Sequence, residues 1–550
     1  MLKLRELKLL RASVGNSPRA LSTRPAANLS DEYTEKPEYP PIQDLSFKAR
    51  KKRAAQTWHE QVKNVTTVEG KLIKVNMPRY YGFRTIMLGD ERVPYNCLPL
   101  SQHYTRTLFE NVQKLPDFYD AAGESVDSFA KSLQGSIEDA VGFATLCFRQ
   151  RKSELPDDTP PAELDRLLGS EIVTQINRLL LMALRDDCAH LSETEVDLDP
   201  RHEAFWFVGG VDPPESVKRM RDGVEWQKEF VNDPVDRAVQ YIGRPYLAVR
   251  HRTPLRPIRP MQEEGRETLE KVPLYKYDAR TVGFATTHRH GTTIPGFWPG
   301  SPHEFGLLSY QCRDYLLKNP DVGPDTNDLL HAHGIQSSFG WLLGQACYQG
   351  FSTYNDITYP LSTQTVITNG QYWSFYVYQL NTTTVHSDCV YNNPKVNYCW
   401  GLSQTKLFEE VDESGKCIGF NEDVLKNLIH FYANVPEERV GVNMKPYLGK
   451  AEQKVADIED DKRRAFLERV FKHLMANRPR HRLVPETYTW EKIYKIDNNT
   501  RPLEAKRRFF ELGVNPFKRR LDDHYGYYIP RDLRPLGRRS KIRHEKNYYP

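Results

Sequence analysis

Residues 366–382, VITNGQYWSFYVYQLNT, contain the clearest pattern of apolar positions in the chain. Successive side chains of an extended strand point to opposite faces, so alternate positions report what each face buries. Here both sets of alternate positions are apolar or aromatic, which is typical of a strand covered on both sides. The pattern therefore predicts a buried strand with two faces, Val366, Trp373, Phe375 and Val377 on one and Ile367, Tyr372, Tyr376 and Tyr378 on the other.

The dipeptide Asn369-Gly370 within this stretch predicts a hairpin. A two-residue type I′ turn needs positive φ at both central residues, which Asn and Gly tolerate best. Such a turn would place Ile367 opposite Tyr372. The alternative is an exposed platform on which RNA bases stack, and that would require one bare face. Because both faces are apolar, the sequence favours burial in a core or a protein interface.

Residues 46–64 predict a helix that begins at Ser46, a preferred N-cap residue, and contains no helix breaker. Its first turns carry a run of basic side chains. They are candidates for contact with RNA phosphates, and the alternative is a solvated charged face. The candidates are Lys48, Arg50, Lys51, Lys52 and Arg53.

Apolar residues three and four positions apart predict that residues 100–187 are mostly helical. Residues 200–320 are short apolar pieces broken by Pro and Gly, which indicates short strands and long loops. Further helices are expected near 325–350 and over 421–434, the second with Asn421 as its N-cap. Helices and strands therefore segregate, and the predicted class is α+β, with a helical N-terminal half and a mixed sheet in the second half.

The first thirty residues are rich in Lys, Arg, Leu and Ser, with Glu6 as the only acid. They lack the uninterrupted apolar stretch of a secretory signal and match the composition of a mitochondrial presequence. Arg19 is the third residue before a cut between Leu21 and Ser22, and an arginine at that position resembles a processing site. The alternative is a disordered basic tail.

The remaining chain divides by composition into four parts. Residues 31–45 are Pro-rich and acidic and are expected to form a linker, followed by an α+β body over 46–437. Within that body, residues 46–195 form the helical part and 196–437 the sheet-containing part. Residues 438–480 predict a charged helix, and 481–550 a basic extended tail with too few apolar residues to bury a core.

Charge is concentrated at the two ends, although the whole chain carries only +5. Residues 501–550 contain fourteen Lys and Arg against six acids, interleaved with Phe and Tyr. Arginine predominates, which suits bidentate phosphate contacts. The tail is therefore a candidate RNA anchor, and the alternative is a solvated disordered tail. Its candidate contacts are Arg507, Arg508, Arg519, Arg520, Arg538, Arg539, Lys541 and Arg543.

The chain contains no phosphate-binding loop, nucleophile elbow or H-E-x-x-H motif. Two H-x-H pairs, His288 with His290 and His331 with His333, allow a metal site in principle, but the second pair falls in a predicted helix. A zinc site from His386, Cys389, Cys399 and Cys417 would have irregular spacing. We expect ordinary histidines and buried free thiols, no cofactor, and no catalytic or metal site. No window approaches the about 20 apolar residues of a membrane span.

Four stretches together resemble a known family: WLLGQACYQGF (341–351), VITNGQYWSFYVYQLNT (366–382), NNPKVNYCWG (392–401) and GFNEDVLKNLIHFYAN (419–434). Their order and spacing are similar to those of the mitochondrial ribosomal protein S-thirty family, also called programmed cell death protein nine. The resemblance covers roughly residues 40–437. Family members end near Pro436, so the resemblance says nothing about the residues that follow.

The resemblance implies a non-catalytic protein of the mitochondrial ribosome, located in the matrix. The family was first assigned to the small subunit and later to the large one. The implied partners are mitochondrial rRNA and other large-subunit proteins, especially the related L-thirty-seven protein. Two alternatives remain open at this point: an RNA-modifying or hydrolytic mitochondrial enzyme built around His288 and His290, and a soluble mitochondrial adaptor.

Overall fold

The structure, a computed structural model, describes residues 44–66, 71, 83–89, 97–223, 225–289, 292–297, 301–313, 326–353, 355–386 and 390–447. The chain divides into two units, residues 1–53 and 54–550. Helix α1 (Phe47–Lys63) extends across this division. It begins where the sequence predicts, and the Ser46 hydroxyl accepts a hydrogen bond from the backbone N–H of Ala49 at 3.2 Å. The expected presequence and basic tail lie outside the described residues.

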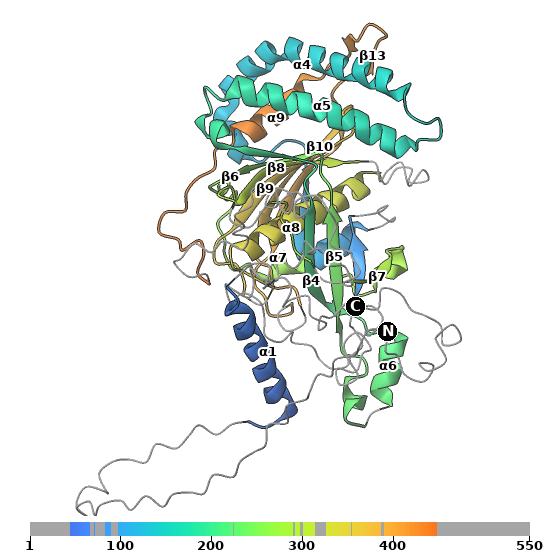
Figure 1. Ribbon diagram of the computed structural model, residues 1–550, viewed down its shortest axis with the longest axis vertical. Helices are drawn as coiled ribbons and strands as arrows, with labels where there is room; N and C mark the ends of the chain where they lie inside the picture. The colour runs from blue at the N-terminus through green and yellow to red at the C-terminus, as the bar shows by residue number, and fades with distance from the viewer. Residues whose placement is uncertain are drawn as a thin grey trace, which may run out of the picture. The chain divides into compact units, whose positions relative to one another are not determined.

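An eight-stranded mixed sheet forms the centre of the second unit (Figure 1). Seven strands follow one path, and β12 (Thr405–Lys406) pairs with β10 beside it. Neighbours are parallel for β8 with β9 and for β11 with β2, and antiparallel elsewhere along the path. In spatial order the strands are β2 (Thr107–Val112), β11 (Asn397–Leu402), β10 (Tyr372–Leu380), β9 (Leu361–Thr368), β8 (Phe305–Cys312), β6 (Leu247–His251) and β3 (Glu195–Leu198).

A second sheet has four strands, in the order β4 (His202–Val211), β5 (Val235–Gly243), β1 (Phe83–Leu88) and β7 (Thr286–Arg289). Two short strands, β13 (Glu410–Val411) and β14 (Cys417–Ile418), form a separate hairpin. Shorter helical elements connect the strands. They are α3 (Leu98–Thr105), α6 (Glu215–Asp222), α7 (Arg266–Glu270) and the 3₁₀ turns η1 (Asp117–Ala122), η2 (Ala189–Glu193), η3 (Glu225–Phe230) and η4 (Ala279–Val282).

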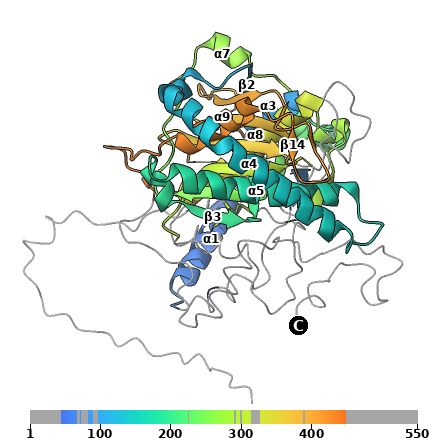
Figure 2. The same ribbon diagram turned by 90° about the horizontal axis from the view of Figure 1, so that it is seen from above.

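Helices cover both faces of the eight-stranded sheet. On one face lie α4 (Gly123–Lys152), α5 (Pro161–Leu184) and α9 (Glu422–Ala433), and Figure 2 shows α4 and α5 running side by side across it. On the other face lies α8 (Thr326–Tyr348), which also packs against β4 and β5 of the four-stranded sheet. Two apolar clusters result, one on each face of the eight-stranded sheet.

Helix α8 is enclosed between the two sheets, and every residue from Leu329 to Tyr348 is buried. Its buried side chains include polar ones such as His331 and Gln336, and burial on all sides is typical of a helix at the centre of a large fold. Two glycines allow the close approach. A Cβ at Gly334 would lie 2.6 Å from the Tyr376 ring of β10, and one at Gly340 would lie 2.3 Å from the Tyr241 ring of β5.

Strands β9 and β10 form an antiparallel hairpin whose side chains divide as the alternation predicts. Trp373 and Phe375 belong to the apolar cluster under α4, α5 and α9, whereas Tyr376 and Tyr378 belong to the cluster around α8. All four are fully buried. An exposed stacking platform is therefore absent from this part of the described chain.

The predicted register of the hairpin is wrong by two residues, because Ile367 pairs with Ser374 and not with Tyr372. Gly370 has a φ of +95°, but Asn369 is not in the left-handed region, so the turn is not type I′. Instead the Asn369 side chain accepts hydrogen bonds from the backbone N–H groups of Gln371 (3.2 Å) and Tyr372 (2.9 Å). This side-chain turn lengthens the loop. A shift of two residues keeps every side chain on its predicted face.

The predicted α+β class is confirmed, with helices and mixed sheets in the described residues. The helices near 325–350 and 421–434 are present as α8 and α9, and the Asn421 side chain caps α9 by accepting from Asp423 N–H at 3.0 Å. The expectation that residues 100–187 are mostly helical missed β2. This strand pairs in parallel with β11, far along the chain, and such pairing leaves no local signal.

Residues 438–447, expected to open a charged helix, are not helical. They run over the body as a strap held by separate contacts. An Arg439 amine donates to the Leu255 carbonyl at 2.6 Å, and the Tyr359 hydroxyl donates to the Met444 carbonyl at 2.9 Å. Lys445 pairs with Glu304 at 2.7 Å.

Helix α5 is long and apolar enough to cross a membrane when judged by length and composition alone. The sequence analysis had predicted no such segment. Four apolar residues of α5, Ile172, Val173, Ile176 and Leu180, are fully buried in the cluster against the eight-stranded sheet. This packing gives one side of α5 a partner within the fold.

We expect Trp373→Ala to lower the free energy of unfolding by about 3–5 kcal/mol, because it empties a fully buried site. The indole also loses its hydrogen bond to the Gly370 carbonyl (2.8 Å) and its edge contact with Tyr310. Denaturant unfolding of the full chain measures the loss. Tyr391→Ala, at an exposed ring, is the control and should change stability by less than about 0.5 kcal/mol. Equal effects of the two substitutions would contradict this account of the hairpin.

Candidate functional site

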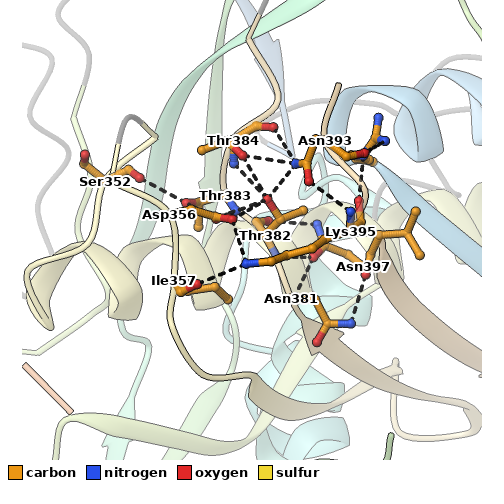
Figure 3. Close-up of polar contacts among 12 residues, drawn as sticks. Ser352, Asp356, Ile357, Asn381, Thr382, Thr383, Thr384, Asn393, Lys395 and Asn397 are labelled. Atoms are coloured by element: carbon orange, nitrogen blue, oxygen red, sulfur yellow. Dashed lines mark hydrogen bonds and ion pairs between the residues drawn. The ribbon is translucent and has the colours of Figure 1, made fainter. Parts of the chain in front are cut away.

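A cluster of polar side chains fills the region where β10 ends and β11 begins (Figure 3). The chain passes through it three times, at the loop after α8, at the segment after β10 and at the approach to β11. We call this cluster the polar knot. Its members are Asp356, Asn381, Thr382, Thr383, Thr384, Asn393, Lys395 and Asn397.

The Asp356 carboxylate is the acceptor at the centre of the polar knot. It accepts hydrogen bonds from the backbone N–H of Thr383 at 2.8 Å and from the Thr382 hydroxyl at 3.1 Å. The Lys395 ammonium lies 3.2 Å from the same carboxylate. Hydrogen bonds to a charged acceptor are stronger than neutral ones, so Asp356 ties two distant segments to its own loop.

Asparagine side chains complete the polar knot by bonding at both ends of their amides. The Asn397 oxygen accepts from the backbone N–H groups of Asn381 (2.7 Å) and Thr382 (2.9 Å). Its nitrogen donates to the Thr105 carbonyl at 2.8 Å. The Asn393 nitrogen donates to the Thr382 hydroxyl at 2.9 Å.

Arg106 connects the polar knot to the edge of the sheet. This residue lies between α3 and β2 in the left-handed region, with a φ of 51°. Its guanidinium donates to the carbonyls of Lys395 (2.7 Å), Val390 (2.8 Å) and Asn393 (2.5 Å). One side chain therefore holds residues 390–395, which lead into β11, beside the start of β2.

The contacts of the polar knot hold three segments of the chain together and so stabilise the fold. Its carboxylate, amides and hydroxyls are engaged with one another and with the backbone, and saturated networks of this kind rigidify a fold. Asn381 begins an N-x-T sequon, but it is buried and its amide nitrogen donates to the Val396 carbonyl at 2.9 Å. The folded chain therefore does not present Asn381 for modification.

A second cluster lies at the β2–β11 edge of the sheet. The Tyr398 and Trp400 rings stack with centroids 5.6 Å apart, and the Arg259 guanidinium lies 4.8 Å and 5.2 Å from their centres. Glu110 of β2 accepts from the Trp400 indole at 2.8 Å and pairs with Arg259 at 3.2 Å. The cluster joins the segment that follows β6 to the edge of the sheet.

The histidine pair on α8 is part of the core. His331 and His333 are both buried, and the His331 Nδ1 lies 3.1 Å from the Tyr376 hydroxyl. Burial lowers the pKa of His331 to about 4, so this histidine is neutral at physiological pH. His288 lies on β7, but its side chain and the whole of His290 lie outside the described residues.

The cysteines considered for zinc are distributed over both faces of the sheet. Cys399 belongs to the apolar cluster around α8, and Cys417 belongs to the cluster under α4 and α9. Both are free thiols, and burial raises their pKa, to about 11 for Cys417. His386 is buried, and Cys389 lies outside the described residues. Within the described residues, no group of three or more His, Cys, Asp or Glu is arranged to hold a metal.

The basic candidates for RNA contact are described only in part. Arg50 and Lys52 are exposed on α1, and Arg53 is partly exposed. Lys48 and Lys51 belong to the same helix, but their side chains lie outside the described residues. All eight candidates between 507 and 543 lie outside them as well.

Sequence reasoning missed the polar knot, although its signal was present. The run Asn381-Thr382-Thr383-Thr384 directly follows a strand that is apolar on both faces. A polar run at the end of a fully buried strand must find partners inside the fold, because unpaired buried polar groups are costly. The identities of Asp356 and Arg106 as partners follow only from the tertiary structure.

Comparison with known protein families gives one finding. A family model described as mitochondrial 28S ribosomal protein S30 (PDCD9) matches residues 6–436. The match covers more than half of the chain. It includes the sheets of the described residues, helices α1 to α9 and the polar knot, and it ends just before the strap.

We expect Asp356→Ala to lower the free energy of unfolding by about 1–3 kcal/mol, because it leaves Thr383 N–H and the Lys395 ammonium without their acceptor. Chemical denaturation measures the loss, and limited proteolysis should show new cleavage between residues 381 and 397. The matched control is Asp117→Ala, which removes an exposed ion pair with Lys114 and should cost less than about 1 kcal/mol. An Asp356→Ala protein as stable as the control would refute a fastening role.

We also expect stability to fall as the pH decreases below about 6.5. Burial lowers the pKa of His202 to about 3 and those of His103 and His331 to about 4, whereas unfolded histidine titrates near 6.5. In this window the unfolded chain binds protons that the folded chain does not. Each histidine therefore removes up to about 1.4 kcal/mol of stability per pH unit.

Denaturant unfolding between pH 7.5 and pH 5 tests this, above the range in which most carboxylates titrate. His103→Gln should make the dependence on pH less steep than in the unsubstituted protein. A stability that stays constant over this range would show that these histidines bind protons as readily in the folded chain as in the unfolded chain.

Proposed function

The chain belongs to the mitochondrial 28S ribosomal protein S30 (PDCD9) family, and we propose that it acts as a structural constituent of the mitochondrial ribosome that supports mitochondrial translation. Membership of this family places the protein in the mitochondrion. The observation that carries the proposal is the match over residues 6–436. The interior agrees with a structural role, because aromatic rings and a saturated polar knot are used for packing and fastening.

The subunit is a finer part of the proposal. The description of the matching family names the 28S subunit, which is the small one, whereas the sequence resemblance led us to expect the large subunit. We propose the large subunit. Gradient sedimentation of dissociated mitochondrial ribosomes tests the choice, since a constituent of one subunit migrates with that subunit alone. Recovery with the small subunit would refute the assignment.

The proposed partners are mitochondrial rRNA and neighbouring proteins of the large subunit, with the related L-thirty-seven protein among them. The basic side chains of α1 and of residues 501–550 are the proposed contacts to rRNA. Exposed Arg50 and Lys52 support the first contact, and the surplus of basic residues supports the second. Phosphate neutralisation by Lys and Arg is the general basis of such contacts.

The ends of the chain have proposed roles of their own. We propose that residues 1–30 are a presequence removed near Leu21-Ser22, and that 31–45 link it to the body. After the strap, a charged helix would lead to the extended tail from residue 481 onward. Sequencing of the N-terminus of the mature protein tests the cleavage, and a mature chain that still begins at Met1 would exclude it.

We expect deletion of residues 501–550 to leave the body folded but to weaken its retention on the ribosome in high salt. Each phosphate contact that the tail makes should steepen the fall of log K with log salt by about 0.7–0.9, by analogy with DNA. Pelleting of full-length and truncated protein with ribosomes over a salt series measures the difference. Identical salt dependence of the two proteins would show that the tail is no RNA anchor.

A further inference from the structure

The β13–β14 hairpin packs against α4. The Arg149 guanidinium donates to the carbonyls of Val411 and Asp412, each at 2.7 Å. Across the hairpin from Val411, the Cys417 thiol lies 3.5 Å from the Glu138 carbonyl. These contacts join helix and hairpin into one surface, which we call the α4–hairpin face.

Apolar side chains are exposed on the α4–hairpin face. Phe143 is 61% exposed, Leu146 is 39% exposed and Ile418 is 51% exposed. Phe143 and Leu146 are three residues apart on α4 and so share one side of the helix. A Cβ at Gly415 in the hairpin would lie 2.7 Å from the Leu146 side chain, which places the hairpin turn beside this stripe. Exposed apolar side chains of this size are typical of an interaction site.

Carboxylates surround these apolar side chains. Asp139 is exposed on α4, and Glu410 and Glu413 are exposed on the hairpin. Hydrogen bonds from Ser414 and from the backbone of Lys416 hold the pKa of the Asp412 carboxyl below its usual range, so it stays charged. The opposing charges beside them are Arg149, which donates to the hairpin carbonyls, and Lys416, and Arg151 and Lys152 follow in the last turn of α4. The four carboxylates at 139, 410, 412 and 413 outnumber Arg149 and Lys416.

The charge of the face distinguishes between the two kinds of partner in a ribosome, RNA and protein. Phosphates would be repelled by the carboxylates, and RNA binding rests mainly on contacts between phosphates and basic side chains. A protein segment with apolar side chains and flanking Lys or Arg would complement both the apolar centre and the acidic rim. The same charges argue against a second acidic face.

We propose that the α4–hairpin face docks a basic, partly apolar segment of a neighbouring protein in the assembled ribosome. The docking rests on the proposed ribosomal function. Phe143 and Ile418 would enter the partner's apolar surface, and the carboxylates at 139, 410 and 413 would pair with its basic side chains. The face is thus a protein contact, separate from the basic candidates for rRNA.

A photo-crosslinking residue, p-benzoylphenylalanine, placed at position 143 of the full chain tests the proposal. Ribosomes carrying this protein are purified, irradiated and analysed for both protein and RNA adducts. We expect adducts with a basic segment of another ribosomal protein. The control position is Leu274, 72% exposed and on neither α4 nor the hairpin, which should give a different set of adducts.

Three results would overturn the docking while leaving the ribosomal function intact: adducts with rRNA, adducts with residues 448–550 of the same chain, or no adducts from a protein that still migrates with a subunit. A protein that fails to migrate with either subunit would instead remove the proposed function, and the docking with it.

A substitution gives an independent test. Phe143→Asp combined with Ile418→Asp should lower the fraction of protein retained on the ribosome by about tenfold, as for loss of central anchors in an interface. Both side chains are exposed, so the fold should persist, and thermal unfolding checks this. The matched control Leu274→Asp should be retained like the unsubstituted protein. Normal retention of the double variant would contradict the proposal.

Discussion

The enclosure of α8 between two sheets is the constraint on which the rest of the structure depends. Side chains fill the space between packed layers, so large side chains on α8 would hold the helix and the sheets apart. Gly334 and Gly340 remove the Cβ atoms where the rings of Tyr376 and Tyr241 approach. The rings then reach the helix backbone, and each sheet closes over α8. A single added methyl group at either position would have to displace an aromatic ring or the helix itself.

The eight-stranded sheet also buries polar groups on the face opposite α8, and glutamines in its central strands bond several of them. Gln364 of β9 accepts from the Tyr119 hydroxyl at 2.8 Å and donates to the Phe431 carbonyl at 2.9 Å. Gln379 of β10 accepts from the backbone of Ile258 and donates to the Arg259 carbonyl. Each side chain attaches an outer segment to the sheet, as the polar knot does at the end of β10. The core is therefore specified by hydrogen bonds as well as by apolar area.

The sequence could predict the elements whose signal is local. Alternation assigned Trp373 and Tyr376 to opposite faces, and the N-cap of α9 was visible at Asn421. The register of the hairpin could not be predicted in the same way, because the turn is formed by the Asn369 side chain and not by the backbone alone. The same side chain also contacts α5. Its amide nitrogen donates to Asp165 at 3.0 Å. Strand β2 and the polar knot depend on pairing across nearly 300 residues, and no periodicity within a segment reports such contacts.

Charge and exposure divide the surface of the molecule by the kind of partner each part suits. Basic residues are concentrated at the chain ends and on α1, whereas the α4–hairpin face combines exposed Phe143 and Ile418 with carboxylates. The two kinds of partner need different surfaces. Binding of phosphates needs basic side chains, whereas binding of a protein segment needs an apolar surface with charged residues at its rim. A rigid body satisfies the second demand, because α4 is held by α5, α9 and the hairpin. The basic composition of the chain ends matches the first demand, and the ends are separate in sequence from the residues that form the face.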